Sequence, residues 1–308
     1  MTAAPKALGR ATLTAFAAAT ILGGGNFIGV RFSNRELEPL WGATLRFSAA
    51  AVLFVVIVLV MRLRWPRGRT LFNTVVYGLL SFALFYALMY WALVRVTAGV
   101  ATVVMAMVPL VTLLLAGAHR MERIGRRQLI GAVLAVVGIG WISIGPDELR
   151  IPPLALLAMG VAIVCVGEAV ILGKKLATNH PAMTNAVAML SGAAALAVMS
   201  AAAGDTWTLP EQTEVRWAVG YLVTLGSVGL FVLILIVVRN WTASATSYMF
   251  VLFPIVTMVL AAALGDERLT ARGITGASIV MAGVWFGALS PAATAPVPVS
   301  GTLPPNQT

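Results

Sequence analysis

The fold of this chain is decided by residues 97–141, which read TAGVATVVMAMVPLVTLLLAGAHRMERIGRRQLIGAVLAVVGIGW. A second copy stands 145 positions later at residues 242–286, TASATSYMFVLFPIVTMVLAAALGDERLTARGITGASIVMAGVWF. The two copies align without a gap and share 14 identities in 45 positions. Self-similarity at a fixed distance sets the architecture before any other signal. In a very apolar chain, a twofold repeat is typical of transporters built from two related halves.

The composition is that of a membrane protein. Hydrophobic residues make up 60% of the 308 residues, charged residues only 10%, and the mean hydropathy is +0.94. A helix needs roughly 20 apolar residues to cross a bilayer, and apolar runs of that length recur along the chain. They lack the alternating polarity of barrel strands, so we predict an all-α integral membrane protein. The net charge of +10 then reflects topology rather than binding of nucleic acid.

Ten membrane spans are predicted, five in each half. They cover residues 11–30, 41–61, 71–93, 97–118, 128–144, 153–173, 182–204, 217–238, 243–264 and 272–290. With residues 1–10 placed in the cytoplasm, 13 basic residues lie on that side and 7 outside, as the positive-inside rule favours. Because five is an odd number, the second repeat (153–290) enters the membrane upside down relative to the first (11–145). The Pro-rich segment 291–308 is expected to be a disordered cytoplasmic tail.

Residues 90–141 also carry a more specific motif. It consists of a small-residue turn, an apolar helix with a central proline, a Glu-Arg pair and a glycine-spaced helix. This pattern resembles the EamA domain of the drug/metabolite transporter superfamily, and the second copy repeats it. The resemblance covers about residues 11–290. It implies two inverted five-helix repeats in a multi-pass protein of the bacterial inner membrane, commonly an exporter of amino acids or other metabolites that hydrolyses no ATP.

Two polar residues are the first candidates for a site inside the membrane. Glu168 is the only acidic residue predicted at bilayer depth, so it is the candidate for substrate binding and proton coupling. The alternatives are a structural pair with Arg46 or an interfacial position. Asn26 takes the corresponding place in the first span, 142 positions earlier, so both side chains would face a central cavity. Alternatively, Asn26 bonds a neighbouring helix.

The other candidates for substrate binding come from aromatic and hydroxyl side chains. They are Tyr86 and its counterpart Phe231, Thr102 and its counterpart Ser247, and Tyr248. Aromatic walls with a few hydroxyls suit an apolar or aromatic side chain carried on a polar head. Aromatic residues near span ends, such as Tyr90, are interpreted mainly as interfacial anchors.

Prolines and glycines supply candidates for gates and for packing. Pro109 and Pro254 each remove a backbone hydrogen bond in mid-span, and Gly24 lies in a run of three glycines. These three are the gating candidates, with static shape and helix packing as the alternatives. A structural role is assigned to Arg46, Glu122, Gly131, Gly138, Glu267, Gly276 and Gly283. Within this group, the favoured interpretation of Arg46 is that its side chain snorkels to the outer interface; the alternatives are that it binds an anionic group of the substrate or locks Glu168.

These features favour a secondary active transporter, a metabolite exporter that works by alternating access and is either proton-linked or facilitative. The alternative is a multidrug efflux pump for lipophilic or quaternary cations, which an anionic Glu168 among aromatic rings would suit. No catalytic cluster is evident, so we predict neither an enzyme nor a cofactor or metal site. The expected partners are a small-molecule substrate, the lipid bilayer and, with coupling, protons. The expected form is a monomer or homodimer.

Overall fold

The computed structural model describes residues 10–119, 125–143, 151–176, 179–240, 243–264 and 270–289. Glu122, Glu267 and the segments 1–9 and 291–308 lie outside these residues. The backbone of Ser247 and Tyr248 is described, but their side chains are not. The predictions for these residues therefore stay predictions.

Within the described residues, the helices form ten consecutive runs. The first half consists of α1 (Arg10–Ser33), α2 (Pro39–Val60), α3–η1–α4 (Gly68–Gly78, Leu79–Leu84 and Phe85–Leu93), α5–α6 (Ala98–Met105 and Val108–Ala118) and α7 (Arg126–Ser143). The second half consists of α8 (Pro153–Lys175), α9 (Pro181–Ala203), α10–η3–α11 (Thr213–Val223, Thr224–Gly229 and Leu230–Asn240), α12 (Ala243–Ala263) and α13–η4 (Ala271–Val284 and Trp285–Leu289). The label η marks a π-helical segment. The predicted all-α architecture is confirmed.

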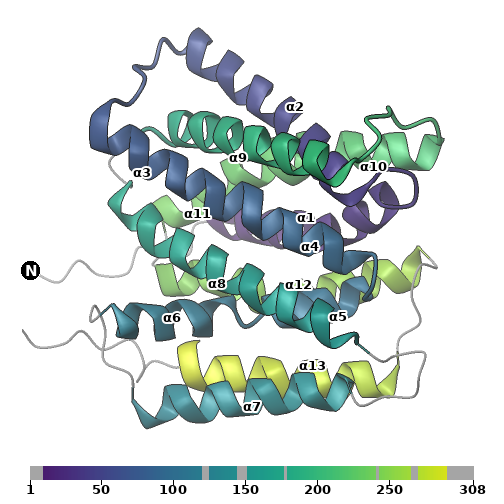
Figure 1. Cartoon of the computed structure of the whole chain (residues 1–308). Helices are drawn as coiled ribbons and strands as arrows, with labels where there is room; N and C mark the ends of the chain where they lie inside the picture. The colour runs from purple at the N-terminus through teal and green to yellow at the C-terminus, as the bar shows by residue number, and fades with distance from the viewer. Residues whose placement is uncertain are drawn as a thin grey trace, which may run out of the picture.

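The helices have the length and surface of membrane spans. In the part of the chain that the structure describes, seven helical runs are long and apolar enough to cross a membrane. Large apolar side chains lie exposed along the flanks, among them Val60 and Trp217. Such a surface is stable when lipid rather than water covers it. The molecule is therefore a multi-pass membrane protein made of two five-helix halves in opposite orientation (Figure 1).

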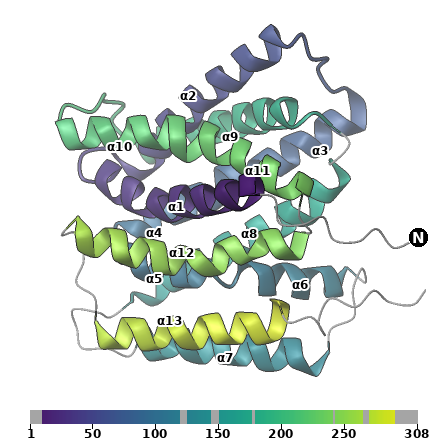
Figure 2. The ribbon, with the colours of Figure 1, turned by 180° about the vertical axis from the view of Figure 1, so that it is seen from behind.

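The two halves interleave instead of lying apart (Figures 1 and 2). At one edge of the bundle α2 packs along α9, and at the opposite edge α7 packs along α13. Between these edges α1 packs against α11 and α12, and α4 packs against α8. Each of these contacts joins an element of one half to an element of the other. The interior of the bundle therefore lies between the halves.

The edge formed by α7 and α13 depends on glycine. A Cβ atom at Gly131 would lie 2.5 Å from the carbonyl oxygen of Gly283, and one at Gly283 would lie 2.7 Å from that of Gly131. Gly138 and Gly276 make similarly close contacts elsewhere along the same pair of helices. Any side chain at these positions would push the two backbones apart. Small residues let membrane helices pack closely where no hydrophobic driving force acts between them.

Two spans contain a π-helical segment at equivalent positions of the repeat. η1 begins at Leu79 and η3 begins at Thr224, which is the same separation of 145 that relates the duplicated sequences. A π-turn changes the hydrogen-bond register of a helix and frequently occurs at functional sites. In both spans the helix continues after the π-turn, as α4 in the first half and α11 in the second.

The gating candidates do not behave as a symmetric set. The helix is interrupted between α5 and α6, just ahead of Pro109, whereas α12 continues through Pro254. α1 also runs unbroken through Gly24, whose carbonyl oxygen accepts a hydrogen bond of 2.7 Å from the Thr257 hydroxyl. Gating by Gly24, Pro109 and Pro254 therefore remains a prediction.

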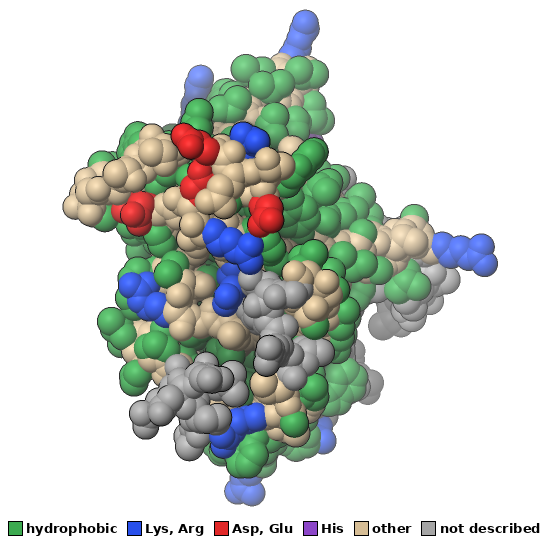
Figure 3. Space-filling view, turned by 90° about the vertical axis from the view of Figure 1, so that its right-hand side faces the viewer, with side chains coloured by type: hydrophobic (Ala, Val, Ile, Leu, Met, Phe, Trp, Pro, Cys, Tyr) green, Lys and Arg blue, Asp and Glu red, His purple; other side chains and the backbone are tan. Residues whose placement is uncertain are grey.

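At one end of the bundle, connections from the two halves are tied together. The carboxylate of Glu36 accepts hydrogen bonds from the backbone N–H groups of Glu211 (2.6 Å) and Gln212 (3.1 Å). Trp41 stacks on Trp207, with 4.8 Å between the ring centroids. Figure 3 looks onto this end, where acidic side chains gather. It is the end that the distribution of charges predicts to face outward.

Candidate substrate cavity

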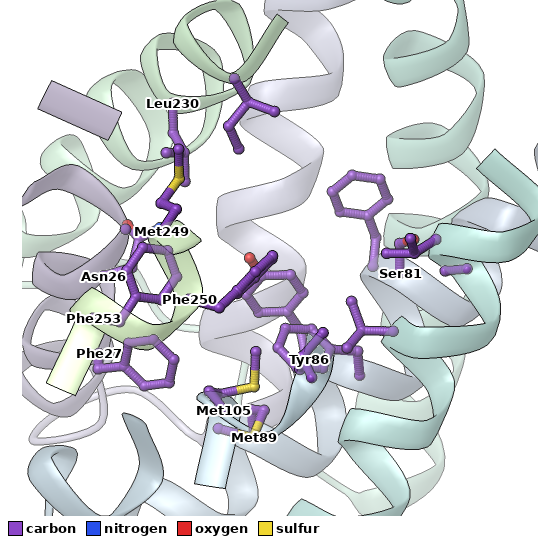
Figure 4. Close-up of a pocket in the computed structure, with 18 of the residues that line it drawn as sticks. Asn26, Phe27, Ser81, Tyr86, Met89, Met105, Leu230, Met249, Phe250 and Phe253 are labelled. Carbon is purple, nitrogen blue, oxygen red and sulfur yellow. The ribbon is translucent and has the colours of Figure 1, made fainter. Parts of the chain in front are cut away.

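A cavity of about 500 Å³ lies between the two halves. Its walls come from α1, α2, α8, α11 and α12 and from the spans that contain η1 and Pro109 (Figure 4). Nine of the lining residues are aromatic, namely Phe27, Tyr77, Phe82, Phe85, Tyr86, Tyr90, Phe231, Phe250 and Phe253. The volume lies within the range of small-molecule sites, and the mainly apolar lining with a few polar groups is typical of them.

The aromatic wall is continuous across the halves. Tyr86 lies close to Phe47 and Phe85, with centroid distances of 4.4 and 4.7 Å. Phe82 reaches Phe231 of the other half at 5.5 Å. Tyr86 and Phe231, which sequence equivalence had paired, both line the cavity. Pairs of rings in such tilted arrangements stabilise one another beyond the burial of their area.

Arg46 is the charged residue of this wall. It is the only residue with a formal charge among the described residues that line the cavity, and its side chain is fully buried. Nε donates to the Ser227 hydroxyl at 3.1 Å, and Nη2 donates to the Gly226 carbonyl oxygen at 3.0 Å. Nη1 has no hydrogen-bond partner among the described residues. The guanidinium carbon lies 5.1 Å from the centroid of the Tyr86 ring.

This geometry corrects the interpretation of Arg46 as a residue that snorkels to the interface. The guanidinium stays inside because η3 offers it a hydroxyl and a carbonyl oxygen in the interior. It does not pair with Glu168 either, since the guanidinium donates to Ser227 and Gly226, whereas Glu168 lies against His119. The depth of a residue in its span did not indicate these partners, which lie about 180 positions away in the sequence.

Asn26 meets the same carbonyl oxygen from another helix. Its Nδ2 donates to the Gly226 oxygen at 3.0 Å, while its buried Oδ1 has no partner in the described part of the chain. A Cβ atom at Gly226 would collide with Oδ1, so this approach requires glycine. Asn26 lines the cavity, as its sequence position had suggested, and it also bonds a neighbouring helix. The two interpretations of Asn26 are thus compatible.

Glu168 is not among the residues that line the cavity. Its two carboxylate oxygens lie 2.9 and 3.1 Å from Nε2 of His119, which directly follows α6. Both side chains are partly exposed, at 31% for Glu168 and 50% for His119. The expectation that Glu168 faces the cavity opposite Asn26 is therefore wrong. His119 could have been found from the sequence, because both residues lie toward the same predicted side of the membrane.

Two further expectations are corrected by the direction of side chains. Thr102 is buried but does not line the cavity; its hydroxyl turns back to its own helix, where its one proton is shared between the carbonyl oxygens of Ala98 (3.0 Å) and Gly99 (2.9 Å). Met105 on the same helix lines the cavity instead. Tyr90, interpreted as an interfacial anchor, is fully buried and borders the cavity. A position near the end of a span does not determine which face a ring takes.

A cavity enclosed by two oppositely oriented five-helix halves defines a class of protein, the membrane transporters built from inverted repeats. The model of the EamA-like transporter family matches the chain twice, at residues 9–144 and 153–288. The chain belongs to this family.

Individual proteins agree with this assignment. The chain is 30% identical to "Uncharacterized inner membrane transporter YedA" of Escherichia coli K12. This alignment of 254 residues covers 81% of each chain. It is 27% identical over 119 residues to "Probable terminal-alkyne amino-acid exporter" of Streptantibioticus cattleyicolor, covering 39% of this chain and 40% of that protein. A solved crystal structure superposes with a TM-score of 0.65 at 16% identity, covering 91% of this chain and 96% of the other, and so shows the same fold.

Proposed function

We propose that this protein exports a small metabolite that joins a carboxylate to an apolar or aromatic body, such as an amino acid, by alternating access. The observation that carries the proposal is Arg46, a buried guanidinium with an unused Nη1 donor in a wall of aromatic rings. The similarity of part of the chain to a protein named as an amino-acid exporter supports both the cargo and the direction.

The positive charge of Arg46 favours a substrate that carries a negative charge. Two unit charges 4 Å apart interact by about 4 kcal/mol at the effective dielectric constant of a protein, against about 1 kcal/mol in water. The polar groups around it, the Ser227 hydroxyl, the Gly226 carbonyl and the Tyr90 hydroxyl, are neutral. A carboxylate would supply both the missing negative charge and an acceptor for Nη1. The aromatic rings would then hold the apolar body of the same molecule.

The same observation speaks against a pump for lipophilic cations. That function was predicted with Glu168 as an anion among the rings, but Glu168 pairs with His119 away from the cavity. A cation in the cavity would meet Arg46, and no Asp or Glu is present among the described lining residues to offset the repulsion.

Proton coupling is proposed for the pair that Glu168 forms with His119. The pair joins α8 of the second half to the residue after α6 of the first half, close to one end of the bundle. A proton taken up by the Glu168 carboxylate would remove the negative charge that faces His119 and so weaken the contact between the two halves at that end. Inverted repeats use movements of this kind to open a central site to one side and then to the other.

Uptake into proteoliposomes tests the proposal. The panel consists of L-phenylalanine, L-leucine and tetraphenylphosphonium, each with and without a pH gradient. We expect saturable uptake of the two amino acids and none of tetraphenylphosphonium. Absence of transport of both amino acids, with or without transport of the phosphonium cation, would overturn the proposal.

A further inference from the structure

We infer that Ser227 and Gly226, in the π-helical segment η3, are positioning residues that hold Arg46 and Asn26 for recognition of the substrate. The inference rests on the proposed function and adds to it the groups of the second half that set the geometry of the carboxylate site. Neither residue needs to touch the substrate. Each acts through a side chain of the first half.

The carbonyl oxygen of Gly226 links η3 to two other helices through hydrogen bonds. It accepts hydrogen bonds from Nδ2 of Asn26 on α1 and from Nη2 of Arg46 on α2, both of 3.0 Å. A carbonyl oxygen has two lone pairs, so this oxygen is fully used. Because the two donors share it, the amide and the guanidinium are held next to one another at the wall of the cavity.

Ser227 holds the guanidinium of Arg46 at a second atom, Nε. Its hydroxyl donates to the carbonyl oxygen of Leu222 at 2.8 Å, five residues earlier, and accepts from Nε of Arg46 at 3.1 Å. Since the hydroxyl proton is committed to Leu222, only a lone pair of the oxygen is left for Arg46. With Nε and Nη2 both engaged by η3, Nη1 is the nitrogen left for a ligand.

The arrangement exists in one repeat only. The residue of η1 that corresponds to Gly226 at the separation of 145 is Ser81, and the residue that corresponds to Ser227 is Phe82. A side chain in the place of Gly226 would collide with Oδ1 of Asn26. The two π-helical segments are thus equivalent in backbone but not in chemistry. One side of the cavity carries the polar group, as a substrate with a single charged head requires.

Ser227→Ala tests the inference, with Thr224→Ala as the matched control. Thr224 lies in the same segment, but its exposed hydroxyl donates to the Gly220 carbonyl oxygen at 2.7 Å, within its own helix. Loss of a hydrogen bond to a charged group corresponds to a roughly tenfold loss of affinity. We expect Ser227→Ala to raise the KM for L-phenylalanine and L-leucine by about that factor, with the maximal rate within about twofold of wild type. Thr224→Ala should match wild type.

A probe without the carboxylate separates positioning from general damage. Inhibition of L-phenylalanine uptake by phenylacetamide, a neutral amide with the same aromatic body, should change little in Ser227→Ala, and Ser227→Thr should restore the KM because it keeps the acceptor oxygen. Ser227→Cys, whose sulfur is a weak acceptor, gives the same readout where the alanine variant is poorly produced. Its KM should rise as in Ser227→Ala.

The outcomes distinguish the two claims. Wild-type protein that transports neither amino acid contradicts the proposed function itself. Active wild-type protein with an unchanged KM in Ser227→Ala overturns the positioning role and leaves the function standing. A loss that affects the amide and the amino acids alike, or that Ser227→Thr does not restore, shows a purely structural role and overturns the inference as well.

Discussion

The variant Arg46→Met tests whether Arg46 binds the substrate or only stabilises the fold. We expect the protein to fold with this change. The Gly226 carbonyl oxygen keeps its bond from Asn26, and the Ser227 hydroxyl keeps its bond to Leu222. The loss is two hydrogen bonds to a charged group, about 1.5–3 kcal/mol each. It is offset by the burial of one ion fewer, which otherwise costs several kcal/mol. We expect the free energy of unfolding to stay within about 2 kcal/mol of wild type.

Transport should respond much more strongly than stability. A carboxylate that loses a charged donor loses about 1.5–3 kcal/mol, which corresponds to a fall of roughly 10- to 150-fold in kcat/KM. The assay is uptake of radiolabelled L-phenylalanine into proteoliposomes, with thermal unfolding of the purified protein measured in parallel. Arg35→Gln is the control, because its exposed ion pair with Glu214 (3.2 Å) and its contact with the Phe32 ring (3.8 Å to the centroid) lie at the end of the bundle, away from the cavity. Such pairs contribute about 0–1 kcal/mol, so both measurements should stay near wild type.

Two results would refute this reasoning. Wild-type uptake of L-phenylalanine by Arg46→Met would show that the guanidinium does not bind the cargo. A large drop in unfolding temperature, together with an equal loss of inhibition by the neutral phenylacetamide, would return Arg46 to a structural role.

Two more predictions concern coupling and packing. Glu168→Gln should abolish transport driven by a pH gradient while leaving membrane insertion intact. Adding His119→Gln to this variant should change transport little further, because the two residues act as one pair. Unchanged coupling to the pH gradient in Glu168→Gln would show that Glu168 does not carry the proton. Gly131→Ala should destabilise the fold by about 1–3 kcal/mol, because the added carbon would lie 2.5 Å from the Gly283 carbonyl oxygen. Gly140→Ala, which meets nothing within 4 Å, should leave the unfolding temperature unchanged or slightly raised, and equal melting of the two alanine variants would contradict the packing argument.

Most of the fold follows from the sequence because apolar length and the repeat are strong signals. The separation of 145 relates the duplicated helices and also relates η1 to η3. No local sequence pattern, however, predicts a π-turn at either position. A π-turn depends on the neighbours that use its altered hydrogen bonds, and these come from distant parts of the chain. The interruption ahead of Pro109 and the continuity at Pro254 show the same limit, since one residue type gives two outcomes.

The site was less predictable than the fold, because its membership depends on the rotation of each helix about its axis. Asn26, Tyr86 and Phe231 face the cavity, whereas Glu168 and Thr102 do not, although all five were placed inside spans. The depth of a residue can be read from its distance to the span ends, but its direction is set by packing between helices. The low periodicity of uniformly apolar helices leaves that direction unmarked in the sequence.

The equivalence of the two halves explains how a packing contact could become a binding group. The separation of 142 that relates Asn26 to Glu168 relates Arg46 on α2 to Ala188 on α9. α9 packs on η1 as α2 packs on η3. In the first of these contacts Gly78, directly before η1, lies against the Ala188 backbone and the Ser191 hydroxyl, which donates to the Ala188 carbonyl oxygen of its own helix, so no charged group enters the contact. In the second, Arg46 fills the place and takes the hydrogen bonds of η3. The repeat thus supplies two corresponding helix contacts, α9 on η1 and α2 on η3. Arginine in place of the small residue in the second contact puts a positive charge on one wall of the cavity.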